Sequence, residues 1–557
     1  MTFYSFVAIR SHPTMNRKFA GLAVALSLVA CSKTPDAPTA SIPDAMKATP
    51  VVAASPPSAA VVQAAHAEDG IAWRKGDVDA AFAEAKAGNK PVYLYWGAVW
   101  CPPCNQVKAT IFNRQDFIER SRFFVPVYID GDSPGAQKLG ARFNVSGYPT
   151  MILFTPDGSE ITRLPGEVDA DQYMRVLAMG MNGARPVKAT LAAALAPGGN
   201  GNSKLAPEDW RMLAYYSWIT DEQQLIPKKD VATTLAKLAK ACPADQMDTA
   251  TRLDLRALAA AADGKDARPR VDSAAADRVT AMLANTELAR KNFDTLANYA
   301  GSMVGYLTPA KSAARVRLVT AWNGALDRFI ADTSLATDDR LSAVNAKIEL
   351  AKLDAPKGAL PAPLLVTVRE QAARADKETT DVYARQSVIS GAGEVLAEAG
   401  LLDESDALLT TELKRSHSPY YFMLGLAANA KKRGDKTSEL DWREKAYVAA
   451  KGPATRLQWG VGYVRALIEN APQDATRIEN AAGQVIGELE ATPETFYERN
   501  RRGLERMGKQ LVAWNKNSQH NDSLQRLRAQ MATVCAKLPA TDPARATCEG
   551  TLRPAKV

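Results

Sequence analysis

The sequence predicts a small α/β domain followed by a large all-α region. Between residues 71 and 183, short β-branched and aromatic runs alternate with segments of helical period. From 205 to 557, Ala- and Leu-rich amphipathic patterns follow one another with hardly a β-rich run. Residues 184–204, rich in Gly and Ala, are predicted as a linker. A chain of 557 residues is too long for one hydrophobic core, so several domains are expected.

The N-terminus predicts export and anchoring. Arg17 and Lys18 precede an apolar run, 19–31, that is shorter than the roughly 20 residues needed to span a bilayer. The run ends in "LVAC", which resembles the bacterial lipobox and implies a signal peptide over 1–30 and lipidation of Cys31. An ordinary signal with an incidental cysteine is the alternative. Ser32 stands where an aspartate would imply inner-membrane retention, so the resemblance implies a periplasmic protein on the outer membrane of a Gram-negative bacterium.

Residues 31–70 are predicted to be a disordered tether. They are rich in Pro, Ala, Ser and Thr and show neither a helical nor a strand period. If largely extended at ~3.1 Å per residue, residues 33–66 would reach roughly 100 Å from the membrane.

The composition excludes one class of partner. Hydrophobic residues make up 46% and charged residues 23% of the chain, which is typical of a globular protein. The net charge is +8, but Arg10, Arg17 and Lys18 lie in the predicted leader. No dense Lys/Arg block is interleaved with aromatic residues, so nucleic-acid binding is not expected.

The α/β domain is predicted to begin with a helix over 77–90, where Val78, Ala81 and Ala85 share one face. The elements predicted after it are a buried strand over 91–98, a helix opening at Cys101, a strand over 123–130, a helix around 135–145, a hairpin over 150–166 and a closing helix over 169–181.

The segment Trp100-Cys101-Pro102-Pro103-Cys104 carries the chemistry. Zinc needs four ligands, and the other cysteines and the four histidines show no paired spacing, so no metal site is predicted. A purely structural disulfide is an alternative, but so short a loop restricts the unfolded chain little. The favoured interpretation is a redox-active disulfide between Cys101 and Cys104 that needs no other cofactor.

Residues 71–183 resemble the thioredoxin superfamily, in particular periplasmic thiol:disulfide interchange proteins. The resemblance rests on the Trp-Cys-Pro-Pro-Cys motif, on Gly147-Tyr148-Pro149-Thr150, on the turn at 156–158 and on Gly166. It implies that Pro149 is cis and lies beside the sulfurs, and that the neighbouring backbone pairs with an extended substrate. The resulting supporting and substrate-binding candidates are Trp100, Pro102, Pro103, Tyr148, Pro149 and Thr150.

The position of the pair predicts its mechanism. Cys101 at a helix N-terminus is the expected nucleophile, and Cys104, one turn further, is expected to resolve the mixed disulfide. Pro102 and Pro103 supply no N–H to stabilise the Cys101 thiolate. This favours a reducing pair or an electron relay, with oxidase or isomerase activity as the rival.

One position departs from the family pattern. Cytosolic thioredoxins carry a buried acid six residues before the nucleophile, whereas this chain has Tyr95 there. Either Tyr95 or a water molecule relays the proton of the resolving thiol, or the resolution of the mixed disulfide is slow.

The all-α region contains one measurable period. Gly400 and Gly434 mark helix breaks 34 residues apart, and Pro419 and Pro453 have the same spacing. This resembles tetratricopeptide repeats over about 385–452, with generic helical hairpins as the alternative. Either arrangement offers an extended surface for protein partners.

The remaining cysteines have structural interpretations. Cys535 and Cys548 are a candidate structural disulfide in an oxidising compartment. Cys242 is left over, either as a buried small hydrophobic residue or as a regulatory thiol.

Together these features predict a lipid-anchored thiol–disulfide oxidoreductase that acts on protein thiols and disulfides and serves cell redox homeostasis. It would need a membrane or periplasmic electron donor, and its helical region would bind clients. The alternative is an interaction scaffold or chaperone in which the α/β domain is a docking module.

Overall fold

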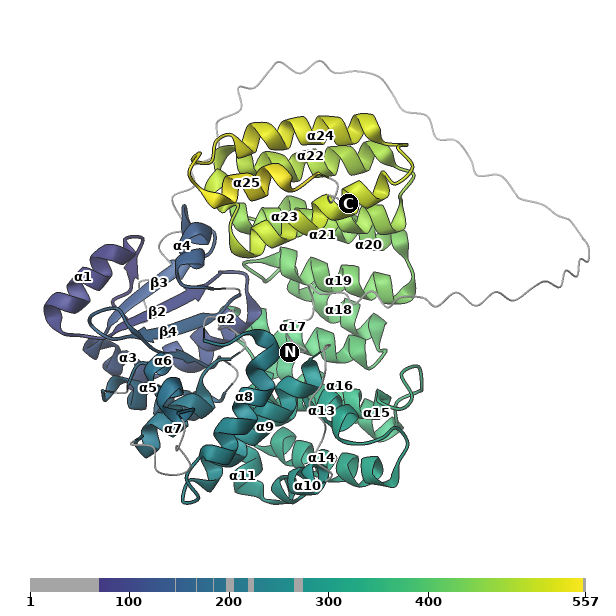
Figure 1. Ribbon diagram of the computed structural model, residues 1–557. Coiled ribbons are helices and arrows are strands. Elements are labelled where there is room, and N and C mark those ends of the chain that lie inside the picture. The colour runs from purple at the N-terminus through teal and green to yellow at the C-terminus, as the bar shows by residue number, and fades with distance from the viewer. Residues whose placement is uncertain are drawn as a thin grey trace, which may run out of the picture. The chain divides into compact units, whose positions relative to one another are not determined.

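A five-stranded mixed sheet forms the centre of the α/β domain (Figure 1). In this computed structural model the described residues are 70–145, 147–166, 168–183, 185–196, 205–218, 225–264 and 274–553. The predicted signal peptide, Cys31 and the tether up to residue 69 lie outside them. The described residues all belong to one compact unit, so the α/β domain and the helices are described together.

The strands are β1 (Arg74–Lys75), β2 (Val92–Gly97), β3 (Val125–Asp130), β4 (Thr150–Phe154) and β5 (Glu160–Leu164). Their order is β1-β3-β2-β4-β5. The strands β1, β3 and β2 are parallel to one another, and β4 is antiparallel to both of its neighbours, β2 and β5. Every residue of β2 is buried, as its continuous apolar and aromatic sequence predicts. The strand β1 was not predicted, because two residues show no period.

Helices cover the sheet. They are α1 (Val78–Gly88), α2 (Pro102–Val107) with its π-helical continuation η3 (Lys108–Phe112), α3 (Gln115–Arg120), the 3-10 turn η4 (Ser121–Phe123), α4 (Ala136–Arg142) and α5 (Ala170–Met181). The helix predicted over 77–90 forms as α1. Asp77 caps its N-terminus by accepting from the amide of Ala80, and Asn89 ends it in a left-handed conformation.

The rest of the described chain is helical, as predicted. The helices are α6 (Val187–Ala194), α7 (Pro207–Tyr215), α8 (Val231–Ala241) after the 3-10 turn η5 (Lys228–Asp230), α9 (Met247–Asp263), α10 (Ala275–Ala284), α11 (Thr286–Lys291), α12 (Phe293–Asn298), α13 (Ala300–Leu307), α14 (Ala313–Ala331), α15 (Thr337–Lys352), α16 (Ala362–Glu378), α17 (Val382–Glu398), α18 (Leu402–Glu412), α19 (Pro419–Arg433), α20 (Lys436–Ala449), α21 (Pro453–Asn470), α22 (Ala475–Ala491), the 3-10 turn η6 (Pro493–Thr495), α23 (Glu498–Trp514), α24 (Asn521–Cys535) and α25 (Pro543–Gly550). None of the helices described here is long and apolar enough to cross a membrane.

The predicted linker 184–204 is not a linker throughout. Its first half forms α6, whose Val187, Leu191 and Ala194 are buried in a core shared with α7, α8 and α9. A short Ala-rich helix resembles linker composition, and only its packing against neighbours shows that it is folded.

The 34-residue spacing coincides with helix boundaries. Gly400 and Gly434 follow α17 and α19 with φ of +84° and +77°, the left-handed conformation that glycine favours after a helix. Pro419 and Pro453 are the first residues of α19 and α21, where proline is tolerated. The assignment to tetratricopeptide repeats remains a prediction.

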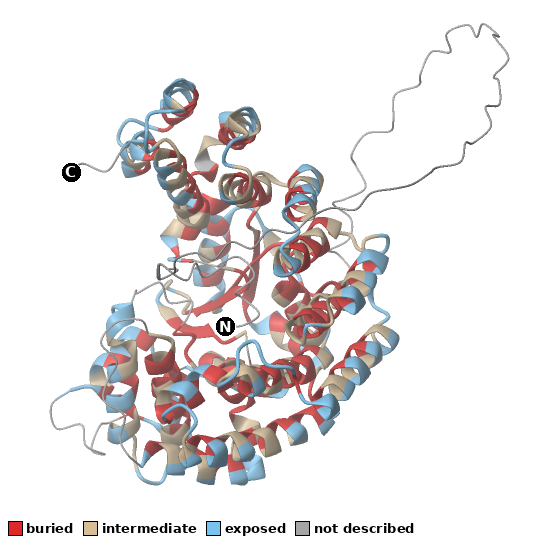
Figure 2. Cartoon of the chain, turned by 90° about the vertical axis from the view of Figure 1, so that its right-hand side faces the viewer, coloured by how far each residue is buried: buried red, intermediate tan, exposed pale blue. Residues whose placement is uncertain are grey.

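One hydrophobic core joins the sheet to the last helices. The cluster that contains β2, Cys101 and Cys104 continues through buried residues of α19–α25, up to Leu552. A second cluster holds α9–α17 together. Figure 2 shows these buried residues on the facing sides of strands and helices. The α/β domain is therefore not packed as a separate body from α19–α25.

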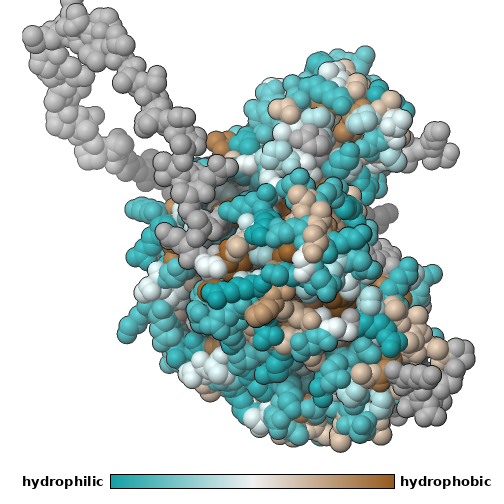
Figure 3. All heavy atoms as spheres, turned by 90° about the vertical axis from the view of Figure 1, so that its left-hand side faces the viewer, coloured by the Kyte–Doolittle hydropathy of each residue, from teal (hydrophilic) through white to brown (hydrophobic). Residues whose placement is uncertain are grey.

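Hydrophilic residues cover most of the face seen in Figure 3. The large hydrophobic side chains that are exposed come from several separate elements: Phe123, Leu195, Met247, Val316, Val366, Val382 and Val448.

Candidate redox site

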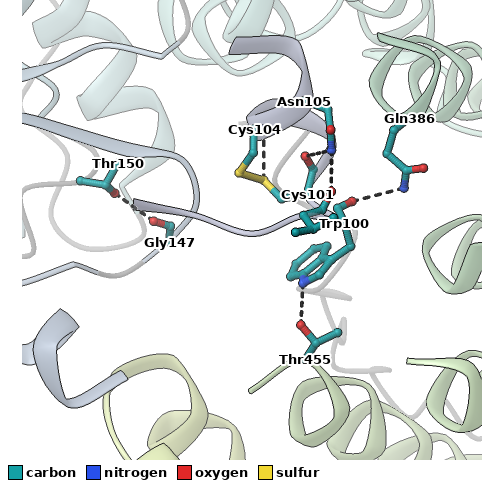
Figure 4. The surroundings of a disulfide bond; sticks show 9 residues. Trp100, Cys101, Cys104, Asn105, Gly147, Thr150, Gln386 and Thr455 are labelled. Carbon is teal, nitrogen blue, oxygen red and sulfur yellow. Dashed lines mark hydrogen bonds between the residues drawn. A yellow bond between two sulfur atoms is a disulfide. The ribbon is translucent and has the colours of Figure 1, made fainter. Parts of the chain in front are cut away.

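The cysteine pair lies where β2 gives way to α2. Cys101 is the N-cap of α2, and its Sγ is bonded to that of Cys104 (Figure 4). The amide of Cys104 donates to Cys101 Sγ at 3.2 Å. Pro102 and Pro103 have no N–H. The first backbone amide of this turn that can donate to Cys101 Sγ is therefore that of Cys104.

The loop before β4 brings the second predicted motif to this end of the sheet. The Tyr148–Pro149 peptide bond is cis, as the resemblance implies. Thr150 pairs with Trp96 in the sheet, and its hydroxyl donates to the carbonyl of Gly147 at 2.9 Å. The Tyr148 ring meets the Trp100 ring edge-on, at 6.2 Å between centroids.

Trp100 is enclosed by the helical region. Its indole Nε1 donates to Thr455 Oγ1 at 2.6 Å, and its carbonyl accepts from Gln386 Nε2 at 3.3 Å (Figure 4). Its ring stacks on Tyr421 at 5.8 Å and meets Trp459 edge-on at 4.9 Å. These partners come from α17, α19 and α21, and no local pattern in the sequence predicted them.

Asp132, in the loop after β3 of the α/β domain, caps the N-terminus of α21. Gly452 is the N-cap of α21 and has no side chain to do so. Asp132 accepts from the amide of Thr455 at 2.8 Å and from its hydroxyl at 2.5 Å. Burial raises the pKa of Asp132 to about 6. Trp100, Thr455 and Asp132 thus form one hydrogen-bonded chain.

Tyr95 lies within β2 and is fully buried. Its ring packs on Phe112 and Tyr128, and its hydroxyl has no hydrogen-bond partner among the described residues. Burial, and then the charge of Asp130, raise the pKa of Tyr95 well above its ordinary value. The hydroxyl therefore keeps its proton at neutral pH, and Tyr95 cannot act as a simple base. Its role as a proton relay remains a prediction.

Asp130 is a carboxyl group in the same corner that the sequence analysis did not single out. It ends β3 and pairs with Gly97, the last residue of β2. Burial raises its pKa, against the opposing effect of Lys108. A buried carboxyl group with a raised pKa is a candidate for proton exchange. Its place at the carboxyl end of a predicted strand is the signal that could have found it.

Two further carboxyl groups of α15 contact α2 and α17. Asp339 accepts from Gln106 of α2 at 3.4 Å, and Asp338 accepts from Ser387 of α17 at 2.6 Å. Burial raises the pKa of each to about 7.

These carboxyl groups predict a pH dependence of stability. A folded-state pKa above the unfolded value means that the folded protein binds the proton more tightly, so stability falls as the pH rises through about 7. We expect the free energy of unfolding to be larger at pH 6 than at pH 8 by about 1.4 kcal/mol for each of the two groups, about 3 kcal/mol in all. His417 has the opposite effect on stability, because burial lowers its pKa to about 4 and its protonation favours the unfolded chain. This loss of stability occurs mostly below pH 6.5, outside most of the range between pH 6 and pH 8.

Thermal unfolding of the wild type and of Asp338→Asn at both pH values measures this effect. The variant should show a flatter dependence on pH. A wild-type midpoint that is equal or lower at pH 6 would contradict the assignment.

The other cysteines lie away from this site. Cys535 and Cys548 form a disulfide between α24 and α25, and both are fully buried. Cys242 is half-buried, and burial raises its pKa to about 11, so its thiol is a weak nucleophile at neutral pH. Within the described ranges, no group of three or more His, Cys, Asp or Glu side chains is placed to hold a metal ion.

Residues 78–180 match the family described as thioredoxin-like domain. Among curated proteins, the thiol:disulfide interchange protein DsbD 1 of Pseudomonas aeruginosa is 34% identical over 101 residues, which are 17% of this chain and 16% of that protein. DsbD of Pseudomonas fluorescens is 30% identical over 103 residues, 18% of each protein. The chain therefore covers less than a fifth of these relatives, 16% and 18%.

Two solved structures are also similar to this part of the chain. A DsbH oxidoreductase is 19% identical, with a TM-score of 0.19, over 20% of this chain and 85% of that one. A thioredoxin from Thermus thermophilus is 26% identical, with a TM-score of 0.18, over 19% of this chain and 86% of that one. The family match over residues 78–180 and the order of elements show a thioredoxin-like α/β domain followed by a largely helical region.

Proposed function

We propose that the protein is a thiol–disulfide oxidoreductase that works through Cys101 and Cys104. The observation that carries the proposal is the bonded cysteine pair at the N-terminus of α2, in a domain similar to that of thiol:disulfide interchange proteins. In the reduced protein, the Cys101 thiolate attacks a partner disulfide and releases one partner thiolate. Cys104 then attacks Cys101 Sγ and releases the second. Two electrons pass to the partner, and the Cys101–Cys104 disulfide forms.

We expect electrons to flow from this protein to its partners, which are protein disulfides. The direction is supported by the single amide, that of Cys104, that donates to Cys101 Sγ. A poorly stabilised thiolate lowers the reduction potential of the pair. A membrane or periplasmic electron donor must then restore the dithiol. Oxidase or isomerase activity is the rival.

The reduction potential tests this direction. Equilibration of the Cys101–Cys104 pair in glutathione and dithiothreitol buffers should give a value nearer to about −270 mV, that of thioredoxin, than to about −120 mV, that of a strong periplasmic oxidant. A value near the second figure would make the protein a donor of disulfides.

We also propose that the protein is held by lipid at Cys31, in the periplasm and on the outer membrane. Its support is the sequence around Cys31 and the Pro- and Ala-rich segment that follows. Cells fed an alkyne fatty acid should label the wild type, whereas Cys31→Ala should be unlabelled and leave the membrane fraction. An unlabelled wild type would show that the leader is of another kind.

The helical region is proposed to bind clients, with tetratricopeptide-like pairs over about 385–452. The alternative is a scaffold or chaperone whose α/β domain only docks. A Cys101→Ala variant that keeps full cellular activity would favour that alternative.

A further inference from the structure

The residues that an exchange partner must meet are all buried. Trp100 is 5%, Cys101 3% and Tyr148 6% exposed. Disulfide exchange requires a partner sulfur to reach a cysteine sulfur directly, and Cys101 is the expected nucleophile. Some part of the molecule must therefore move before a protein disulfide can react.

The helical region supplies the burying surface. Four of its residues touch Trp100, the neighbour of Cys101, and we call them the redox-site cover: Gln386, Tyr421, Thr455 and Trp459. Together they contact the backbone and the side chain of Trp100. Thr455 accepts from the indole N–H and Gln386 donates to the backbone carbonyl, while the other two residues pack on the ring. In Figure 4, Thr455 and Gln386 approach Trp100 from separate elements.

The redox-site cover is also fastened from the α/β side. Asp132 supplies the N-terminal cap that α21 lacks, and Thr455 Oγ1 donates to it while accepting from Trp100. A cap provided by another part of the fold links the position of α21 to the loop after β3. Opening the site would break this chain of hydrogen bonds and expose the aromatic cluster.

We propose that the redox-site cover closes the dithiol site, and that a partner disulfide reaches Cys101 only after this contact with Trp100 opens. The inference rests on the proposed function and adds regulation of access to it. The helical region then both excludes unselected disulfides and can admit a client that competes for its contacts with Trp100.

Alkylation of Cys101 in the chemically reduced, full-length protein tests this. When opening precedes reaction, the rate follows the open fraction of the molecules. We expect Thr455→Val, which removes the hydroxyl that bridges Trp100 and Asp132, to speed reaction with N-ethylmaleimide about tenfold. Trp459→Ala should speed it about 100-fold. Peptide mass spectrometry separates Cys101 from the other thiols, and rates are compared above the thiol pKa so that the thiolate fraction does not enter.

Trp514→Ala is the matched control. Trp514 also belongs to the helical region, but it stacks on His520 and donates to the carbonyl of Pro472, away from Trp100. Its loss should leave the rate of Cys101 alkylation unchanged. Circular dichroism checks each fold; if Trp459→Ala does not fold, Thr455→Val decides alone.

The proposal is overturned if Cys101 of the wild type reacts as fast as in Thr455→Val. Failure of the proposed function looks different, because the Cys101–Cys104 pair would then not interconvert in glutathione buffers, whatever the alkylation rates.

Discussion

Replacing Cys101 by serine should abolish the reduction of a protein disulfide, whereas replacing Cys104 by serine should stop the reaction at the mixed disulfide between Cys101 and the partner. A serine hydroxyl at the N-terminus of α2 cannot form the mixed disulfide, so the Cys101→Ser variant should reduce insulin no faster than dithiothreitol alone. In Cys104→Ser, Cys101 can still attack, but nothing resolves the product. Non-reducing gels should then show a covalent complex that dithiothreitol dissolves.

Cys242→Ser is the control for these variants, since its thiol lies outside the site and should not be needed. The assignment of roles would be reversed if Cys101→Ser trapped the complex and Cys104→Ser did not. Full insulin reduction by Cys101→Ser would remove the redox function altogether.

Gly452→Ala should destabilise the protein strongly, because two separate costs meet at this residue. Its φ of +86° and ψ of 143° are a conformation that residues with a Cβ rarely adopt. A Cβ there would also lie 2.3 Å from the Asp132 carboxyl carbon and displace the cap of α21. We expect a loss of about 3 kcal/mol or more, measured by urea unfolding, and a faster alkylation of Cys101.

Gly434→Ala separates the two costs. Gly434 also has a positive φ, +77°, but a Cβ there meets nothing within 4 Å. Its substitution should cost only about 1 kcal/mol and leave Cys101 reactivity unchanged. Equal effects of the two substitutions would mean that the Asp132 cap contributes nothing to stability.

Much of the fold followed from local patterns. The buried strand β2, the amphipathic helix α1 and the helical region after residue 205 have clear periods, and the structure confirms the predicted fold class. The strand β1 is too short to show a period. The helix α6 was mistaken for linker, because Ala-rich composition alone does not show whether a segment is packed.

The candidate site was predictable only in part. The Cys101–Cys104 pair and Pro149 could be recognised because short segments carry them. Asp132 and Asp130 could have been found at the carboxyl end of a predicted strand. Thr455 and Gln386 could not, since they lie 355 and 286 residues from Trp100 along the chain.

Residues close together in the sequence were enough to propose a redox chemistry for this protein. Cys101 and Cys104 lie within one turn at the N-terminus of a helix, and the two prolines between them remove two backbone amides, so the expected roles of the two cysteines follow from a short segment. The surroundings of Trp100, on which the proposed control of access depends, are set by the tertiary fold. The contacts that bury Trp100 come from three separate helices. Those from α19 and α21 belong to the continuous core that joins the sheet to α19–α25, and the contact from α17 follows from the packing of α17 against α2.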